Sequence, residues 1–379
     1  MTKPFHIVLT TIRLPTVLTA YFDNIRRYEH LDEVKIWIVG DLKTPPETAG
    51  LARDLSGRGL ETVFLDIAAQ DRWGERFPAF YAGLPYNNET RRNIGYLRAL
   101  ADGCRVLISI DDDNFPDSRN FMAGHRDTGR ARKGTLFQSA TGFYNVCRHL
   151  ELDTPRKVYP RGFPLSLRDG APHEAVTGTS DRDARVGVKA GLWTGAPDLD
   201  AVTWLNGPVT SRAYLGDDCC LLAPDTWMPV NNQNVSVVRD LIPAFLCVPM
   251  GWKVPGGRIE RYGDIWGGYF LQAVMRSTCF HVAFGRPVVD HRRNAHDYPA
   301  DLRREYWGLV LTDWLVDILK NRFQSDSRDI PARVLDLAGF LREEAAPSLP
   351  DWCPEEMKGF LKHTGANLAA WAEACQSLL

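Results

Sequence analysis

The stretch RVLISIDDDN, from Arg105 to Asn114, runs from an apolar segment straight into three consecutive aspartates. Its short apolar run, rich in β-branched residues, predicts a buried strand. Adjacent carboxylates repel one another by about a kcal/mol or more, and a divalent cation relieves that repulsion. Mg²⁺ and Mn²⁺ prefer oxygen ligands and commonly bind one or two carboxylates together with phosphate oxygens. We therefore predict a Mn²⁺ or Mg²⁺ site here, the alternative being an acidic turn at the surface.

Two further features bear on this cation. Alternate residues of an extended segment point to the same side, so Asp111 and Asp113 would share a face and Asp112 would point elsewhere. A second strand-like segment ends at His291, in VDHRRNAH, and His291 could supply a nitrogen ligand. Taken alone, an exposed loop histidine is the simpler interpretation. His296 is the competing ligand and lies further from the strand end.

Strand-like and helix-like segments alternate over the first 115 residues, which predicts a largely parallel sheet. Ligands of such sheets bind beyond the carboxyl ends of the strands. Asp41 and the three aspartates both fall at such ends, so we expect them at one rim of the sheet. The predicted strands are 5–12, 34–41, 61–67 and 105–114, and the predicted helices are a stretch that ends at Tyr28 and a second one at 90–103.

The rest of the chain predicts an α/β fold with a mainly parallel central sheet and a helical C-terminal region. Residues 116–230 are rich in Gly, Pro and Asp, and we expect loops with short strands there. A helix over 262–275 and a strand over 280–289 follow, and the pattern becomes helical from Asp301. We divide the chain into a ligand-binding and catalytic domain, 1–300, and a helical region, 301–379.

Composition narrows the class of protein. The 379 residues carry a net charge of −2, which argues against a broad nucleic-acid surface. No apolar run is long enough to span a membrane, and the N-terminus does not resemble a cleaved signal peptide. The eight cysteines are scattered without a CxxC pair, so we expect a reduced, cytoplasmic protein. The signatures of dinucleotide dehydrogenases, P-loop ATPases, α/β-hydrolases and zincins are absent.

Four other motifs carry candidate side chains. Arg161 lies between Pro160 and Gly162 on a stiff loop, where it suits a bidentate phosphate contact or is a plain surface arginine. Asp264 starts a predicted helix, either as its cap or as a substrate contact. Asp198 and Asp200 alternate in GLWTGAPDLDAVT, and paired carboxylates can bind sugar hydroxyls, act as a base or form a solvated loop edge. The amides of VNNQN, including Asn231 and Asn232, suit a polyhydroxyl ligand or a turn.

Taken together, these motifs resemble the reversibly glycosylated polypeptide family, whose plant members are UDP-arabinopyranose mutases. The resemblance covers roughly residues 90–310 and rests on RRNIGYL, SIDDD, RGFPLSLRDG, GLWTGAPDLDAVT, NNQNVSVVRDLIPA, RYGDIWGGY and HRRNAH. It implies a GT-A glycosyltransferase fold, a nucleotide-diphosphate-sugar donor and a divalent metal at the aspartates. Arg161 matches the arginine that the family glycosylates reversibly. Asn114 stands where the plant proteins have cysteine.

The first hypothesis is a metal-dependent glycosyltransferase that moves a sugar from a nucleotide-diphosphate sugar to an acceptor, which we expect to be a small molecule. The second is a nucleotide-sugar mutase with reversible self-glycosylation, and the third is a non-catalytic sugar-nucleotide-binding subunit. A homo-oligomer is compatible with the sequence. The expected metal ligands are Asp111, Asp113 and His291; the expected donor contacts are Thr10, Thr11, Arg13, Asp41, Arg92, Asp111, Asp112, Asn231 and Asn232; and the expected catalytic residues are Arg161, Asp198, Asp200 and Asp264.

Overall fold

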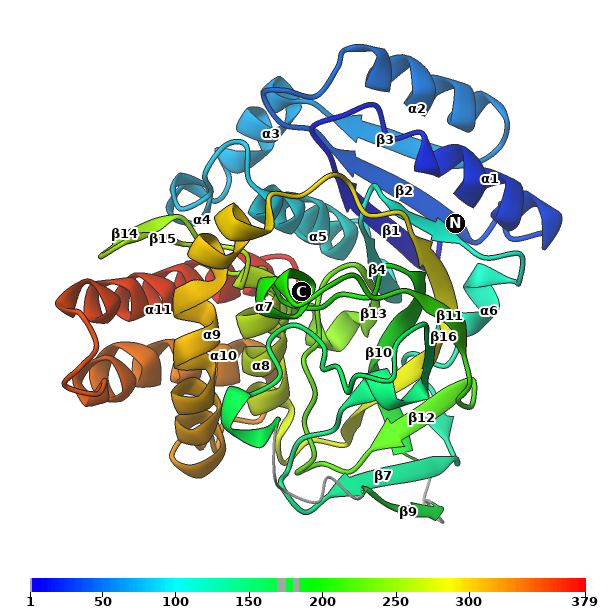
Figure 1. Cartoon of the computed structure of the whole chain (residues 1–379). Coiled ribbons are helices and arrows are strands. Elements are labelled where there is room, and N and C mark those ends of the chain that lie inside the picture. The colour runs from blue at the N-terminus through cyan, green and yellow to red at the C-terminus, as the bar shows by residue number, and fades with distance from the viewer. Residues whose placement is uncertain (1, 169–174, 180–183) are drawn as a thin grey trace.

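Parallel strands form the N-terminal half of one 14-stranded sheet (Figure 1). The computed structural model describes residues 2–168, 175–179 and 184–379 of the chain. Almost every side chain of the three inner strands is buried, because helices cover both faces of a parallel sheet. The strand order is β3-β2-β1-β4, with all neighbours parallel. These strands are β1 (Phe5–Thr10), β2 (Val34–Val39), β3 (Glu61–Leu65) and β4 (Val106–Ile110).

Beyond β4 the sheet becomes mixed. Strand β13 runs antiparallel to β4 and to β10, and β10 and β16 run parallel to each other. The carboxyl ends of β1, β4, β10 and β16 and the amino end of β13 therefore meet at one edge, which we call the strand-end edge. The strands of this half are β7 (Thr135–Ser139), β9 (Ala175–Thr179), β10 (Ala184–Gly195), β12 (Cys219–Leu222), β13 (Asn234–Val238) and β16 (Phe280–His291).

Short strands complete the sheet and fix the register at this edge. Strand β5 (Asn114–Pro116) pairs antiparallel with the end of β16, so that Asn114 lies opposite His291. This pairing holds the residue before Asn114, Asp113, beside the histidine. The remaining short strands are β6 (Ala131–Arg132), β8 (Leu150–Leu152), β11 (Ser211–Tyr214) and the separate hairpin of β14 (Trp252–Val254) and β15 (Gly257–Ile259).

Helices pack on the sheet and form a C-terminal group. Figure 1 shows α9 to α11, in yellow to red, gathered at the opposite side of the molecule from α1 and α2. Helix α5 packs against β1 and β2, and α8 contacts β16, α9 and α10. The helices are α1 (Val17–Arg27), α2 (Glu47–Gly57), α3 (Ile67–Gly74), α4 (Pro78–Ala82), α5 (Arg92–Ala101), α6 (Phe121–His125), α7 (Ala201–Leu205), α8 (Gly263–Met275), α9 (Tyr298–Asn321), α10 (Ile330–Phe340) and α11 (Glu355–Gln376).

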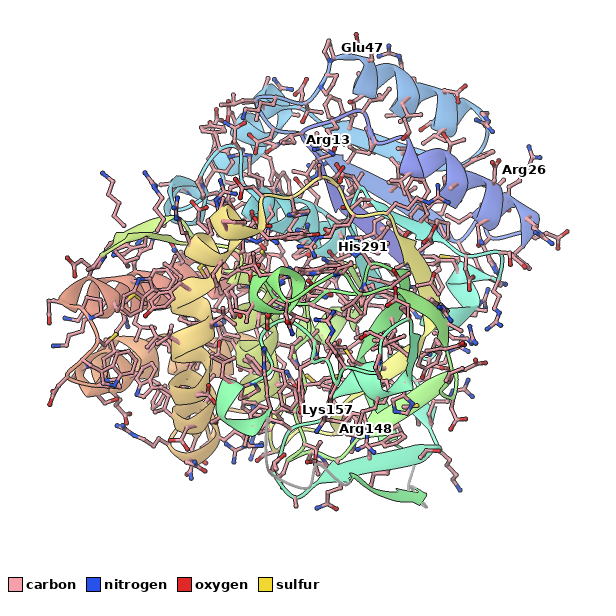
Figure 2. The ribbon with its side chains drawn as sticks, in the orientation of Figure 1. Arg13, Arg26, Glu47, Arg148, Lys157 and His291 are labelled. Atoms are coloured by element: carbon pink, nitrogen blue, oxygen red, sulfur yellow. The ribbon has the colours of Figure 1, made fainter. Side chains whose placement is uncertain are left out.

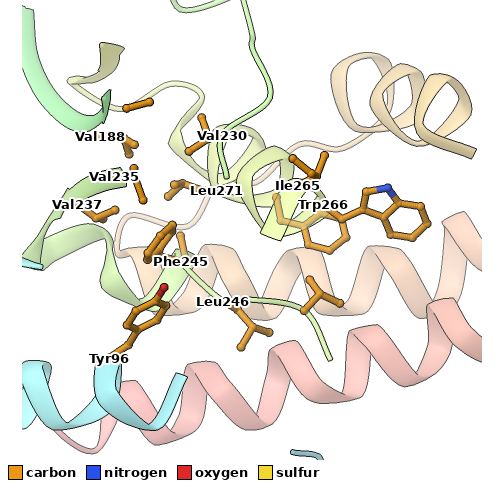
Figure 3. Packing of buried hydrophobic residues seen from close by; sticks show 14 of the residues in the cluster. Tyr96, Val188, Val230, Val235, Val237, Phe245, Leu246, Ile265, Trp266 and Leu271 are labelled. Atoms are coloured by element: carbon orange, nitrogen blue, oxygen red, sulfur yellow. The ribbon is translucent and has the colours of Figure 1, made fainter. Parts of the chain in front are cut away.

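Helix α8 joins the sheet to the C-terminal helices through a continuous apolar core. Nearly all of its residues are buried, and the fully buried Trp266 packs its ring on Phe360 of α11 at 5.8 Å. On the sheet side, Tyr96 of α5 stacks on Phe245 at 5.0 Å, next to the valines of β10 and β13 (Figure 3). The strand-end edge is thus built on a packed scaffold.

Most of the predicted elements are present, and two corrections follow from tertiary context. Helix α2, which begins at Glu47, was not among the predicted helices, because the Pro-rich segment before it indicates a turn. The 12-residue β10 lies in the segment expected to hold only short strands. Its glycines hide the strand pattern: a Cβ on Gly191 would lie 2.1 Å from the Nδ2 atom of Asn234. Helix α9 begins at Tyr298, so the predicted boundary at residue 300 falls in its first turn, and the division into two regions stays a prediction.

Candidate functional site

Two adjoining cavities lie at the strand-end edge. The larger has a volume of about 640 Å³ and the smaller about 280 Å³. A volume of several hundred Å³ is typical of a site for a complete small molecule. The walls that the two cavities share are formed by Ile12, Glu89, Arg92, Asp111 and Asp113. The acidic end of β4 therefore stands where the cavities meet.

The smaller cavity is lined by the residues that follow β1 and β2. Thr10, Thr11 and Asp41 all lie in its wall, as the strand-end rule predicted. The two carboxylate oxygens of Asp41 accept hydrogen bonds from the backbone N–H groups of Leu42 (2.7 Å) and Asn88 (3.1 Å). This leaves a rigid polar wall. Asn88 itself was missed in the sequence, because its place depends on the loop before α5.

The three aspartates have three different partners. Asp111 accepts a 2.6 Å hydrogen bond from Arg92, whose guanidinium is buried and also bonds the carbonyl of Asn232. Asp112 accepts a 2.6 Å bond from the Thr11 hydroxyl, and Asp113 accepts a 3.0 Å bond from the Asn294 amide. The predicted alternation of Asp111 and Asp113 on one face holds to the extent that both line the larger cavity, whereas Asp112 lines only the smaller one.

The pKa values of the triplet diverge for the same reason. Burial raises the pKa of Asp111, and Asp113 adds to the rise although Arg92 opposes it. Burial also raises the pKa of Asp112. For Asp113, burial is outweighed by the hydrogen bond and charge of His291, so its pKa is lowered. Asp113 is therefore the carboxylate of the three most strongly held in its ionised form.

His291 and Asp113 fit a shared cation. The Nδ1 atom of His291 lies 2.5 Å from the carbonyl oxygen of Ala196 and must donate to it. Its Nε2 atom therefore faces Asp113 Oδ2, 3.5 Å away, with a lone pair unless a proton is bound there. A proton on Nε2 would donate to Asp113, and when that proton is absent the two lone-pair donors suit one cation between them.

The third predicted ligand is differently placed. Within the part of the chain that the structure describes, no group of three or more His, Cys, Asp or Glu residues converges as a metal site. Asp111 is turned to Arg92 instead, because the buried guanidinium of Arg92 is stabilised by the nearest carboxylate. His296 contacts Asp301 at 2.6 Å and is likewise occupied. The residues present thus supply two protein donors, which fits a cation that takes its remaining ligands from phosphate and water.

Arg161 has all five of its N–H groups bonded. Nε and Nη2 bond the two oxygens of Asp198 at 2.9 and 3.1 Å, and Nη1 and Nη2 bond those of Asp264 at 3.1 and 2.7 Å. The remaining Nη1 N–H donates to the carbonyl oxygen of Arg261. Gly162 allows this arrangement, since its φ of +82° favours glycine and a Cβ there would meet Ile265 at 2.2 Å.

The guanidinium is therefore saturated by protein groups. A guanidinium has five N–H donors and no more, so none of those of Arg161 is left for a diphosphate in this conformation. Its side chain is 7% exposed, and its two carboxylates raise its pKa well above the ordinary value although burial opposes them. Asp264 lies in the first turn of α8 without capping it, since Tyr262 is the cap residue.

The other predicted side chains fall into two groups. Asn231 donates to Asp198 at 2.8 Å, and Asn232 lines the larger cavity with its Nδ2 atom buried and without a partner among the described residues. Asp200 does not line either cavity. It is fully buried, caps α7 by accepting from Thr203, and pairs with Arg168 at 2.6 Å, so its role is structural in this fold.

Figure 2 labels Arg13, which follows β1, and His291, the last residue of β16. Both residues line the larger cavity. Arg13 donates to the Asn294 side chain, which in turn bonds Asp113, so a short relay joins the two strand ends. Several cavity residues escaped the sequence analysis, although Arg261, Arg293 and Asn294 lie in motifs that it quoted. They are Glu89 before α5, Arg261 before α8, Arg293 and Asn294 between β16 and α9, and Asp301 and Arg304 in α9, and only the folded chain brings them together.

Comparison with known proteins places the chain in a family. A model described as reversibly glycosylated polypeptide matches residues 77–352. The chain belongs to that family. The family predicted from the sequence is thereby confirmed, and the sheet and helices described above confirm the predicted α/β fold class.

The similar curated proteins are plant enzymes. UDP-arabinopyranose mutase 1 of Oryza sativa subsp. japonica is 28% identical over 63% of this chain and 60% of its own length. UDP-arabinopyranose mutase 3 of Arabidopsis thaliana is 25% identical over 78% of this chain and 74% of its own length.

Solved structures show a more distant likeness. Glucosyl-3-phosphoglycerate synthase from Mycobacterium tuberculosis, crystallised with Mn²⁺ and UDP-glucose, is 12% identical with a TM-score of 0.38, covering 82% of this chain and 79% of its own. The mannosyltransferase PcManGT from Pyrobaculum calidifontis, with GDP-Man and Mn²⁺, is 10% identical with a TM-score of 0.38, covering 100% and 75%.

Proposed function

We propose that the protein transfers a sugar from a nucleoside diphosphate sugar to a small acceptor with the help of a divalent cation. The observation that carries the proposal is the meeting of two cavities at Asp111 and Asp113, with His291 facing Asp113 across 3.5 Å. One cavity suits the nucleoside, and the other is large enough for the sugar and a second substrate. The acidic junction between them is where a diphosphate would lie.

The smaller cavity supplies the nucleoside contacts. Thr10, Thr11 and Asp41 line it with hydroxyl and carboxylate oxygens that suit the donors of a base and a ribose. Asp112 adds a further carboxylate whose Oδ2 atom is already bonded to the Thr11 hydroxyl. Because Asp41 is fixed by two backbone N–H groups, this surface keeps its shape before the ligand arrives.

Asp113 and His291 would hold the Mn²⁺ or Mg²⁺ ion. When bound, the cation offsets the charge that develops on the departing diphosphate. Arg92 donates to Asp111 and would hold this carboxylate in position at the junction where the diphosphate lies. Arg13, which has no carboxylate within ion-pair distance among the described residues, can approach the diphosphate from the end of β1.

The larger cavity would orient the sugar. Asp198 and Asp264 are held in one plane by the Arg161 guanidinium, and Asn231 adds a bond to Asp198. A carboxylate fixed in this way is a good acceptor for sugar hydroxyls. In this proposal Arg161 is a positioning residue, which departs from the expectation that it binds the diphosphate or carries the sugar. Asn232 also lines this cavity, and its buried amide nitrogen has no partner among the described residues.

A mutase is the second candidate, and family membership favours it. The relatives named above are UDP-arabinopyranose mutases, and Arg161 matches the family's glycosylated arginine. A carrier role would require a guanidinium nitrogen to attack the sugar, yet a protonated guanidinium is a poor nucleophile and here its N–H groups are all bonded. The transferase therefore stays first.

The test is product analysis with purified protein, Mn²⁺ and a panel of nucleotide sugars. Sugar transfer or donor hydrolysis supports the transferase, and a ring-isomer of the donor supports the mutase. Intact-mass spectrometry after incubation should show no sugar adduct on the protein. An adduct that disappears in Arg161→Ala would move the mutase to first place. Binding without turnover by any donor would reject both enzymatic proposals in favour of a binding subunit.

The compartment and the assembly remain predictions. Among the described residues no helix is both long and apolar enough to cross a bilayer. We keep the cytoplasmic location and a homo-oligomer as proposals, tested by fractionation of the native cells and by light scattering of the purified protein.

A further inference from the structure

Two arginines of the larger cavity lack a carboxylate partner. Arg92, Arg161, Arg261 and Arg304 each lie within 4 Å of an Asp or Glu oxygen. Within the described part of the chain, Arg13 and Arg293 make no such pair, and Arg293 makes no hydrogen bond either. Arg293 is half-buried, and none of its nitrogen atoms is among the fully buried unpartnered atoms of the described residues, so its N–H donors stay accessible to an acceptor in the cavity.

Arg293 is nevertheless held firmly. Its guanidinium lies 4.6 Å from the ring centre of Trp204 and 5.4 Å from that of Tyr298. These two rings are stacked at 5.8 Å with planes only 3° apart, and His296 continues the stack on Tyr298. Aromatic faces attract a cation without using its N–H donors. The rings thus position Arg293 and leave its hydrogen-bonding edge to the cavity.

The nearest charges do not neutralise it. Burial lowers the pKa of Arg293, and Asp198 opposes that shift from a distance. The two oxygens of Asp198 are already bonded to Arg161 and Asn231. Asp301, the other carboxylate near Arg293, is taken by His296 and Arg261. The N–H donors of Arg293 are therefore open to an anionic acceptor from outside the protein.

We propose that Arg293 binds an anionic group, a carboxylate or a phosphate, on the acceptor substrate. The proposal rests on the proposed function, because it names the chemistry of the second substrate in the same cavity. The donor diphosphate has a separate place: Asn294 turns toward Asp113 and Arg13, whereas Arg293 lies on the rings of α7 and α9. Planar forked donors suit carboxylate and phosphate oxygens.

The test uses inorganic phosphate as the probe and the neighbouring arginine as the control. Arg293→Gln keeps much of the side-chain volume on the rings but removes the charge. Arg292→Gln is matched in sequence, yet the Arg292 side chain is 61% exposed, pairs with Asp290 and lines neither cavity. Calorimetry would follow phosphate binding to protein already saturated with UDP and Mg²⁺. Tryptophan fluorescence would confirm that each variant is folded.

We expect phosphate to bind the UDP-saturated wild type. The affinity for phosphate should be about tenfold or more weaker in Arg293→Gln and unchanged in Arg292→Gln. Equal phosphate affinity in wild type and Arg293→Gln, or no phosphate binding to the UDP complex, would overturn the proposal. A loss of UDP affinity in Arg293→Gln would assign the guanidinium to the donor diphosphate and equally reject it.

A second arm identifies the source of the anion. With UDP-glucose as donor, glucose 6-phosphate and glucuronate are compared with glucose as acceptors or competitors. The proposal predicts that only the anionic members compete with phosphate, and that their advantage over glucose disappears in Arg293→Gln. If UDP does not bind the wild type at all, the proposed function fails. Phosphate is then titrated into the wild type and both variants without nucleotide, which tests the anion site by itself. A phosphate affinity weakened only in Arg293→Gln supports the anion site, and equal affinities reject it.

Discussion

Replacing Arg161 by methionine should destabilise the fold and should do so in a pH-dependent way. The change leaves Asp198 and Asp264 facing each other without their shared cation, although their side chains are only 9% and 15% exposed. Removing one partner of a buried ion pair costs about 3–5 kcal/mol, because the remaining charge is left uncompensated. We therefore expect Arg161→Met to lower the free energy of unfolding by about 4 kcal/mol at pH 7.

The sign of the pH dependence follows from Asp198. In the wild type, burial is outweighed by Arg161 and Asn231, so the pKa of Asp198 is lowered. Its contribution to stability is present above its unfolded pKa and is lost as the pH falls through the lower folded pKa. Without Arg161, burial and Asp264 would raise that pKa, and stability would fall as the pH rises. The deficit of the variant should therefore shrink from pH 7 toward pH 4.

The assay is urea unfolding followed by the fluorescence of the 11 tryptophans. Arg292→Met is the control, since breaking an exposed ion pair should cost less than about 1 kcal/mol. Adding Asp198→Asn to Arg161→Met should recover part of the loss, because it removes one unpaired charge. If the free energy of unfolding of Arg161→Met lay within about 1 kcal/mol of that of the wild type at pH 7, the stabilising role of the Arg161 ion pairs would be refuted. A difference in stability that does not change with pH would refute it equally.

Three further predictions concern the acidic strand end. Asp113→Asn should weaken Mn²⁺ binding about tenfold or more and nearly abolish turnover while leaving the unfolding curve unchanged; full activity of EDTA-stripped wild type would contradict the metal role. His291→Ala should also weaken Mn²⁺ binding measured by calorimetry. An unchanged affinity for Mn²⁺ would mean that His296 or water, and not His291, is the ligand. Asn114 is buried, and neither of its side-chain polar atoms has a hydrogen-bond partner among the described residues. Asn114→Cys should therefore raise the free energy of unfolding by about 1 kcal/mol, and a drop in thermal midpoint would contradict this.

Local sequence pattern predicted the edge of the sheet well. Strands β1, β2, β4 and β16 are mainly apolar runs that end in or lead into polar residues, and such runs can be recognised from the local sequence alone. The rule that ligands lie beyond strand ends then brought Asp41, Asp113 and His291 to one rim, where the structure has them. The motifs shared with the family added Arg161, Asp198 and Asp264.

Pairing between distant side chains could not be predicted in the same way. Arg92 pairs with Asp111, which was expected to bind the metal, and Arg168 pairs with Asp200. Both ion pairs depend on contacts between segments that are distant in the sequence. Arg293 was visible as one of two adjacent arginines, but only the rings of α7 and α9 distinguish it from its exposed neighbour. Strand β10 was not predicted at its full length, because its glycines, which are required by close packing, interrupt the apolar pattern of the strand.

The central claim is that the strand-end edge binds a nucleoside diphosphate through a cation held by Asp113 and His291. Calorimetric titration of the purified protein with UDP, with and without Mn²⁺, tests it most directly. The account predicts that Mn²⁺ strengthens UDP binding about tenfold or more in the wild type and has no such effect in Asp113→Asn. Equal UDP affinity with and without Mn²⁺, or an undiminished Mn²⁺ effect in the variant, would contradict it.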